Sequence, residues 1–259
     1  MSGVKQPWLE APSAKALRTL ISSQTVEGGQ GKWNSLDIGG GVKIKIKGKD
    51  FSPTDVKNTQ DVFKEARTDI NIANQIVNDA LSSWSEKTKA LAERYFFVAS
   101  NALEEAHAQK IRSVISAAQT GLNQPMSLKL VDGAGTRASV PQSSQEFINN
   151  NSISVKPNWI KHPGSDDKST MYAAGIRFDR WYLQGSGIED KTVPTIVLRA
   201  KTLIHESTHR FANTKDYAYF KDDGVALDTN LVAPALSETD KWLDNADSFG
   251  WFCVQLAKA

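Results

Sequence analysis

Hydrophobic residues recur at helical spacing over positions 53–120 of the chain. In one regular series each residue comes seven positions after the one before: Val56, Phe63, Ile70 and Val77. This spacing keeps the four side chains on one face of a helix. It predicts a long amphipathic helix, with Ser52 as its N-cap and Pro53 in its first turn. Further helices are predicted over about 85–97 and about 99–118.

Positions 42–47 alternate strictly between hydrophobic residues and lysines. Alternation with a period of two is typical of a half-buried strand. The lysines are expected to form an exposed basic face, which discourages pairing at the edge of a sheet. After Pro125 the pattern changes to short strands and loops, and strands are predicted over 127–131, 153–156 and 175–183.

These elements predict an α+β fold with a helical N-terminal part and a small, mostly antiparallel sheet. We expect residues 1–50 to form a lead-in with a strand or hairpin, and residues 51–259 to form the main domain. Within this domain the helical part spans 53–120, and the sheet and the functional residues lie in 125–259.

The charge balance and the hydrophobic runs exclude two classes of partner. The 31 Lys and Arg residues against 29 Asp and Glu leave a net charge of +2, which is too small for binding to nucleic acid through its phosphates. No hydrophobic run approaches the roughly 20 residues that a membrane-spanning helix requires. We therefore expect neither a nucleic-acid partner nor a membrane partner. The single cysteine, Cys253, excludes an internal disulfide and is expected to be buried.

The segment 195–211 is predicted to be a helix that carries the chemistry. Pro194 precedes it, and its broad hydrophobic face comprises Ile196, Val197, Ala200, Leu203 and Ile204. Within it stands the run His205-Glu206-Ser207-Thr208-His209. Two histidines four positions apart share one face of a helix, so both rings can bind one zinc ion at about 2.0 to 2.1 Å. Glu206 can present a carboxylate to a metal-bound water without being a ligand.

A catalytic zinc site needs a third protein ligand, and acidic residues follow the helix. Asn213 can adopt the left-handed conformation that ends a helix and turns the chain back, which would bring Asp216 to the metal. Reach alone leaves three alternatives open: Asp222, Asp223 and Asp228. The other histidines are expected to be a solvated or capping residue, His107, and a loop residue, His162.

These motifs resemble the aspzincin metallopeptidases, the family of deuterolysins and fungal lysine-specific metalloendopeptidases. The family signature is HExxH followed by GTxDxxYG, which the segments 205–209 and 214–219 resemble, and an NADS segment, which 245–248 matches. The resemblance implies a zincin-like fold with the HExxH motif on the active-site helix and one catalytic Zn²⁺ ion. It implies that Asp216 is the third zinc ligand, Glu206 the general base and Tyr219 a donor to the oxyanion. It also implies that Asp247 lines the pocket for the residue after the cut bond.

The chain departs from the family pattern at several positions. Asn213 and Phe220 stand where the signature has glycines, and Gly250 stands where the lysine-specific members carry a second acid. The single cysteine also excludes the disulfides of the secreted fungal members. We therefore expect a preference for a basic residue after the cut bond that is weaker than strict lysine specificity.

The expected function is a zinc-dependent metalloendopeptidase that hydrolyses peptide bonds with a metal-activated water and acts on a protein or peptide substrate. The alternatives are a zinc amidase acting on cell-wall peptide and a non-catalytic binding module braced by zinc. Residues 1–12 lack the features of a secretory signal peptide. The expected location is nevertheless outside the cell, as for an exported toxin or effector, with the cytoplasm as the alternative. A secretion-system or inhibitor partner is compatible with this location, although no residue identifies it.

Overall fold

The structure is a computed structural model, and it describes residues 33–47, 52–98, 102–131, 137–139, 176–179, 192–228 and 239–259. The chain divides into two compact units, which we describe separately. The first unit comprises 1–61, 124–141 and 155–186, and the second comprises 62–123, 142–154 and 187–259. The predicted strand over 153–156 and His162 lie outside the described residues.

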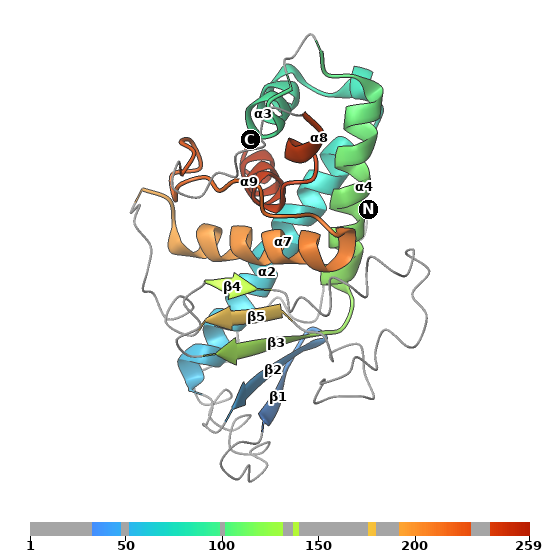
Figure 1. Ribbon diagram of the computed structural model, residues 1–259. Coiled ribbons are helices and arrows are strands. Elements are labelled where there is room, and N and C mark those ends of the chain that lie inside the picture. The colour runs from blue at the N-terminus through green and yellow to red at the C-terminus, as the bar shows by residue number, and fades with distance from the viewer. Residues whose placement is uncertain are drawn as a thin grey trace. The chain divides into compact units, whose positions relative to one another are not determined.

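The first unit contains a five-stranded sheet with the strand order β1-β2-β3-β5-β4 (Figure 1). The strands are β1 (Trp33–Gly39), β2 (Val42–Lys47), β3 (Met126–Val131), β4 (Ala138–Ser139) and β5 (Ile176–Asp179). β1 pairs with β2, and β4 with β5, in antiparallel fashion, whereas β2 pairs with β3, and β3 with β5, in parallel. The α+β class is confirmed, but the sheet is mixed instead of mostly antiparallel.

The strand predicted over 42–47 is an inner strand and not an edge strand. β1 and β2 form a hairpin whose turn uses three glycines with positive φ, Gly39, Gly40 and Gly41. β2 pairs with β1 on one side and with β3 on the other. The expected exposed basic face is wrong at Lys45, which is 4% exposed.

The predicted N-terminal helices are present, but the third, predicted over about 99–118, begins and ends about five residues later in the chain. They are α2 (Pro53–Val77), α3 (Glu86–Phe96) and α4 (Glu105–Asn123), with a short 3₁₀ helix, η1 (Leu81–Ser83), before α3. Ser52 caps α2 as predicted, because its hydroxyl accepts from the Asp55 N–H at 3.1 Å, while the Asp55 carboxylate accepts from the Ser52 N–H at 2.9 Å. The predicted capping role of His107 is also present, since its Nδ1 accepts from the Glu104 N–H at 3.3 Å.

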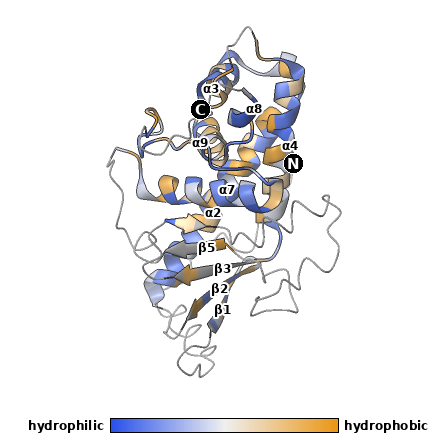
Figure 2. Ribbon diagram, viewed as in Figure 1, coloured by the Kyte–Doolittle hydropathy of each residue, from blue (hydrophilic) through white to orange (hydrophobic). Residues whose placement is uncertain are grey.

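The second unit packs α7 (Thr195–Ala212) against α4 and α9 (Ala246–Ala257), and the short helix α8 (Thr239–Trp242) precedes α9 (Figure 1). Hydrophobic and hydrophilic residues alternate around α4 and α7 (Figure 2), so each can bury one face. The aromatic core joins α3 to α9: the Phe96 ring centroid lies 4.8 Å from that of Phe249 and 5.3 Å from that of Phe252. Cys253 is fully buried, as predicted.

Close contact between α7 and α4 requires a glycine in α4. A Cβ atom at Gly121 would lie 2.2 Å from the Phe211 ring, so no larger residue fits there. Among the described helices, none is long and hydrophobic enough to cross a membrane.

Candidate metal centre

The helix α7 places His205 and His209 one turn apart on a buried face. Their Nε2 atoms are 3.1 Å apart, and both residues are less than 5% exposed. The hydrophobic residues predicted to support this helix include Leu203 and Ile204, which are fully buried. The motif spacing therefore brings two imidazole nitrogens to one point, as expected for residues four positions apart on a helix.

Asn213 ends α7 and reverses the chain toward the two histidines. It has φ 59° and ψ 31°, the left-handed conformation that the sequence predicted for it. The Thr214 N–H donates back to the carbonyl of Thr208 at 3.4 Å. The following residues bring the Oδ1 atom of Asp216 to 3.2 Å from His205 Nε2 and 3.1 Å from His209 Nε2.

The hydrogen-bond partners of the two Nδ1 atoms show which nitrogen of each histidine carries the proton. His205 Nδ1 lies 3.1 Å from a carboxylate oxygen of Asp247, and His209 Nδ1 lies 2.7 Å from the carbonyl oxygen of Thr214. Both partners can only accept, so each Nδ1 carries the proton and each Nε2 is left with a lone pair. Two such nitrogens and one carboxylate oxygen that face one another require a cation between them.

The spacing of these atoms suits zinc. Ligands at about 2.0 to 2.1 Å in tetrahedral geometry are about 3.3 Å apart, close to the 3.1 to 3.2 Å observed here. Within the described part of the chain, His205, His209 and Asp216 form the group that could hold a metal ion. Two nitrogens and one oxygen leave a fourth position open, as in catalytic zinc sites.

In the metal-free protein, the same contacts determine the charge states of Asp216 and His205. Burial opposes a charge on Asp216, but hydrogen bonds from His205 and His209 outweigh it and hold its pKa below the usual range. Burial likewise opposes a charge on His205, but its hydrogen bonds to Asp216 and Asp247 raise its pKa to about 10. A proton then takes the place that a metal cation would fill.

Glu206 lies beside the three ligand atoms but is not one of them. Its Oε1 is 3.9 Å from His205 Nε2, and its Oε2 is buried without a hydrogen-bond partner in the described structure. Burial raises the pKa of this carboxyl group, although the nearby His205 and His209 oppose the shift. An unpaired buried carboxylate is costly for folding, which favours a functional reason for its presence.

Tyr219 forms another wall of the centre. Its ring stacks on that of His205 with centroids 5.7 Å apart and an interplanar angle of 24°. Burial, followed by the negative charge of Asp216, raises the pKa of the phenol above its ordinary value. The hydroxyl therefore stays protonated and remains a hydrogen-bond donor at neutral pH.

Asp247 is fully buried in the first turn of α9, and both of its oxygens are occupied. Oδ1 accepts from His205 and forms an ion pair with the Lys201 ammonium group, while Oδ2 accepts from the Phe220 N–H at 2.8 Å. Burial opposes its charge, but Lys201 and His205 together outweigh this and lower the pKa of Asp247. In the described contacts this carboxylate positions His205, and its expected role in binding substrate stays a prediction.

Sequence reasoning missed Lys201, and it named Asn245 within the segment 245–248 without giving it a role. Lys201 lies four residues before His205, so the helical spacing already placed it on the histidine face. Asn245 is fully buried, and its Oδ1 accepts from the N–H groups of Tyr217 and Ala218 at 2.9 and 3.1 Å. It therefore fixes the loop that carries Asp216, and the polar segment 245–248 was its only signal.

Comparison with known proteins gives a structural match, which has a low TM-score. No family model matches the chain, and no curated protein matches it. A solved structure of a zinc peptidase from Grifola frondosa is 15% identical, and the match covers 74% of this chain and 94% of that chain with a TM-score of 0.38. The functional argument below therefore rests on the residues of the metal centre.

Proposed function

We propose that the chain is a zinc-dependent peptidase of the aspzincin type that hydrolyses peptide bonds in a protein or peptide substrate. The observation that carries the proposal is the convergence of His205 Nε2, His209 Nε2 and Asp216 Oδ1 beside Glu206, whose buried Oε2 has no hydrogen-bond partner in the described structure. A zinc ion held by these three residues supplies a Lewis acid that polarises a carbonyl group and lowers the pKa of a water molecule.

Glu206 supplies the general base. Its buried carboxylate has a pKa raised by burial, which makes it a better acceptor for the proton of the attacking water, and it can return that proton to the leaving amine. The reaction consumes one water and breaks the C–N bond to give a carboxylate and an amine. The free Oε2 atom of Glu206 is available for this proton because no described group occupies it.

Tyr219 supplies a hydrogen bond to the carbonyl oxygen as negative charge develops on it. Its position against the His205 ring holds the phenol beside the ligands. A protonated donor in a partly buried site stabilises such an oxyanion more strongly than it would in water.

The alternative of a zinc-braced binding module has less support. A structural zinc site is usually closed by four protein ligands, whereas the described cluster has three and keeps a buried acid beside them. The choice of peptide over another amide substrate rests on the motif resemblance. An exported location and a secretion-system or inhibitor partner stay predictions.

A preference for a basic residue after the cut bond would depend on the negative charge of Asp247. The ion pair with Lys201 balances that charge within the protein. The contacts of Asp247 thus favour at most a weak preference, and the cut ends of a peptide library would measure it.

The proposed function is tested by incubating the protein with a randomised peptide library, with chelator, without it, and after zinc is restored. We expect cleavage that the chelator abolishes and zinc restores. The Glu206→Gln variant should keep one zinc per chain but lose nearly all cleavage, because an amide cannot accept the proton. Cleavage at the wild-type rate by this variant would contradict the mechanism.

A further inference from the structure

The segment 219–228 carries Tyr219 and folds back on itself. The Asp228 N–H donates to the Tyr219 carbonyl at 2.8 Å, and a bridge pairs Phe220 with Leu227. The two ends of the segment are therefore hydrogen-bonded to each other. A support at any point along it contributes to the position of Tyr219.

Two side chains at the start of α9 hold the residues on either side of Tyr219. The Oδ1 atom of Asn245 accepts from the Ala218 N–H at 3.1 Å, and the Oδ2 atom of Asp247 accepts from the Phe220 N–H at 2.8 Å. Both side chains also support the metal ligands. Neither can therefore be changed without affecting the zinc site.

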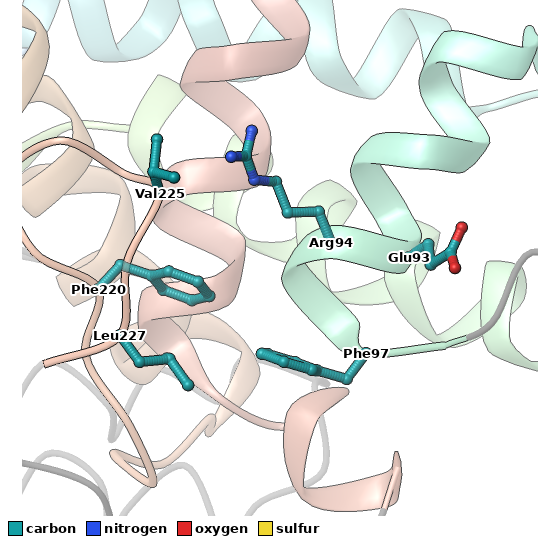
Figure 3. Close-up of a pocket in the computed structure, with 6 residues that line it drawn as sticks. All are labelled: Glu93, Arg94, Phe97, Phe220, Val225 and Leu227. Atoms are coloured by element: carbon teal, nitrogen blue, oxygen red, sulfur yellow. The ribbon is translucent and has the colours of Figure 1, made fainter. Parts of the chain in front are cut away.

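A separate support comes from Tyr95 of α3, which is fully buried. Its hydroxyl donates to the Gly224 carbonyl at 2.9 Å, and its ring packs edge-on against that of Phe220 with centroids 5.2 Å apart. Figure 3 shows the Phe220 ring pointing from the segment toward α3. The described hydrogen bond and ring contact of Tyr95 thus go to this segment and not to a zinc ligand.

The tip of the segment also rests on α9. Gly224 has φ +67°, and a Cβ atom there would lie 2.6 Å from the Trp251 ring. Glycine is needed both for this conformation and for the close approach. The tip is therefore held between the Tyr95 hydroxyl and the Trp251 ring.

Tyr219 and Phe220 are supported from opposite sides. Consecutive residues of an extended segment point to opposite faces. On one face the Tyr219 ring stacks on that of His205 with centroids 5.7 Å apart, and on the other face the Phe220 ring meets Tyr95. Tyr95 therefore lies behind the segment, where it limits how far Tyr219 can move away from the metal centre.

We propose that Tyr95 is a positioning residue, which holds Tyr219 in the place from which its hydroxyl donates to the oxyanion. The inference rests on the proposed function and adds to it a residue outside the motif segments 205–209, 214–219 and 245–248. An oxyanion donor is effective because it is fixed before the charge develops. Loss of this support should therefore slow the chemical step and leave the binding of zinc and substrate unchanged.

The test uses Tyr95→Phe, which removes the hydroxyl and keeps the ring. Loss of a complete oxyanion donor lowers kcat by about 10² to 10³, and a displaced donor keeps part of its effect. We therefore expect kcat to fall about tenfold, while KM and zinc affinity change less than twofold.

The matched control is Thr59→Val on α2. It removes another fully buried hydroxyl that donates to a backbone carbonyl, that of Asp55 at 2.7 Å. Each variant should lower Tm by about 2 to 4 °C, as expected for one lost hydrogen bond. Only Tyr95→Phe should also lower kcat.

A double-mutant cycle with Tyr219→Phe separates positioning from a purely structural role. If Tyr95 acts through the Tyr219 hydroxyl, Tyr95→Phe should change kcat less than twofold in protein that already carries Tyr219→Phe. Gly224→Ala moves the tip away from Trp251 with Tyr95 intact, and its effect on kcat should depend on Tyr219 in the same way. Equal fractional loss from Tyr95→Phe in both backgrounds, or no loss in the wild-type background, would overturn the proposal.

Hydrogen exchange separates this proposal from the proposed function. Amide exchange of the segment 219–228 is measured by mass spectrometry in zinc-loaded wild type, Tyr95→Phe and Thr59→Val. Exchange about fivefold faster in Tyr95→Phe alone, as one lost hydrogen bond predicts, supports the hold of Tyr95 on the segment even if the wild type cuts no peptide. Chelator-sensitive cleavage by the wild type together with unchanged exchange in Tyr95→Phe would overturn the role of Tyr95 and leave the function standing.

Discussion

The two histidines of the metal centre are held in place by different kinds of group. His205 donates to Asp247, a side chain 42 residues away on α9 whose charge is balanced by Lys201. His209 donates to the backbone carbonyl of Thr214, five residues further on. One side of the centre therefore depends on buried charges from two helices, and the other depends on the turn that ends α7. A single substitution can remove the first support, whereas no side-chain change removes the second.

The largest effect is expected from Asp247→Asn. The change removes the charge that orients His205 and leaves the Lys201 ammonium group without its partner. Zinc affinity should fall by about 10- to 100-fold, as is typical when the partner of a ligating histidine is lost. Competition with a zinc-binding dye measures it. The control is Asp244→Asn, a partly exposed aspartate that pairs weakly with Lys110 at 3.7 Å, and equal affinity in both variants would contradict the role given to Asp247.

The pH dependence of zinc binding should reflect the contacts that hold His205. The pKa of His205 in the metal-free protein is raised from 6.5 to about 10. Through the neutral range its Nε2 therefore holds a second proton, in addition to the one on Nδ1. That proton stabilises the metal-free fold at low pH, and its contribution is lost as the pH rises toward about 10. Zinc must displace it, so affinity should rise about tenfold per pH unit above neutrality. A titration in which affinity is constant over these values would show that His205 is not protonated.

The smallest effect is expected from Thr214→Val, on the side of His209. The Thr208 hydroxyl donates to the carbonyl of His205 at 2.8 Å, so the Thr214 hydroxyl donates to Thr208 at 2.8 Å. Its loss should lower the free energy of unfolding by about 1 kcal/mol. Zinc affinity should change less than threefold, because the Thr214 carbonyl remains at 2.7 Å from His209 Nδ1, whereas the lost hydroxyl lies further away at 3.4 Å. Chemical denaturation and the dye competition measure the two quantities, and a large loss of affinity would show that the hydroxyl also positions His209.

The difference between the two sides also marks how far the sequence could predict the site. The helix, the position of His205 and His209 on one face of it and the left-handed Asn213 follow from local rules, and all three are confirmed. Reach alone could not choose Asp216 over Asp222, Asp223 or Asp228, and the resemblance supplied that choice. The described contacts place Asp216 with the histidines.

The support of His205 could not be predicted because it depends on how α9 packs on α7. A Cβ atom at Gly250 would lie 3.0 Å from the Lys201 carbonyl oxygen and 3.3 Å from His205 Cβ. The absence of a side chain at Gly250 lets the first turn of α9, with Asp247, approach the histidine. The sequence drew attention to Gly250 only as a missing acid.

The pairing of strands in the sheet could not be predicted from the sequence either. Alternation identified the strand over 42–47, but its neighbours come from distant parts of the chain. β2 pairs in parallel with β3, more than 80 residues later, through the register that joins Val42 to Met126. Strand pairing of this kind depends on tertiary packing, which no local pattern specifies.

The central claim is that His205, His209 and Asp216 hold one zinc ion with Glu206 outside its coordination. It is tested most directly by crystals grown with zinc, in an anomalous difference map recorded at the zinc absorption edge. We expect one peak per chain, at about 2.0 to 2.2 Å from His205 Nε2, His209 Nε2 and an oxygen of Asp216. A map without a peak there, or with Glu206 among the ligands, would contradict the account.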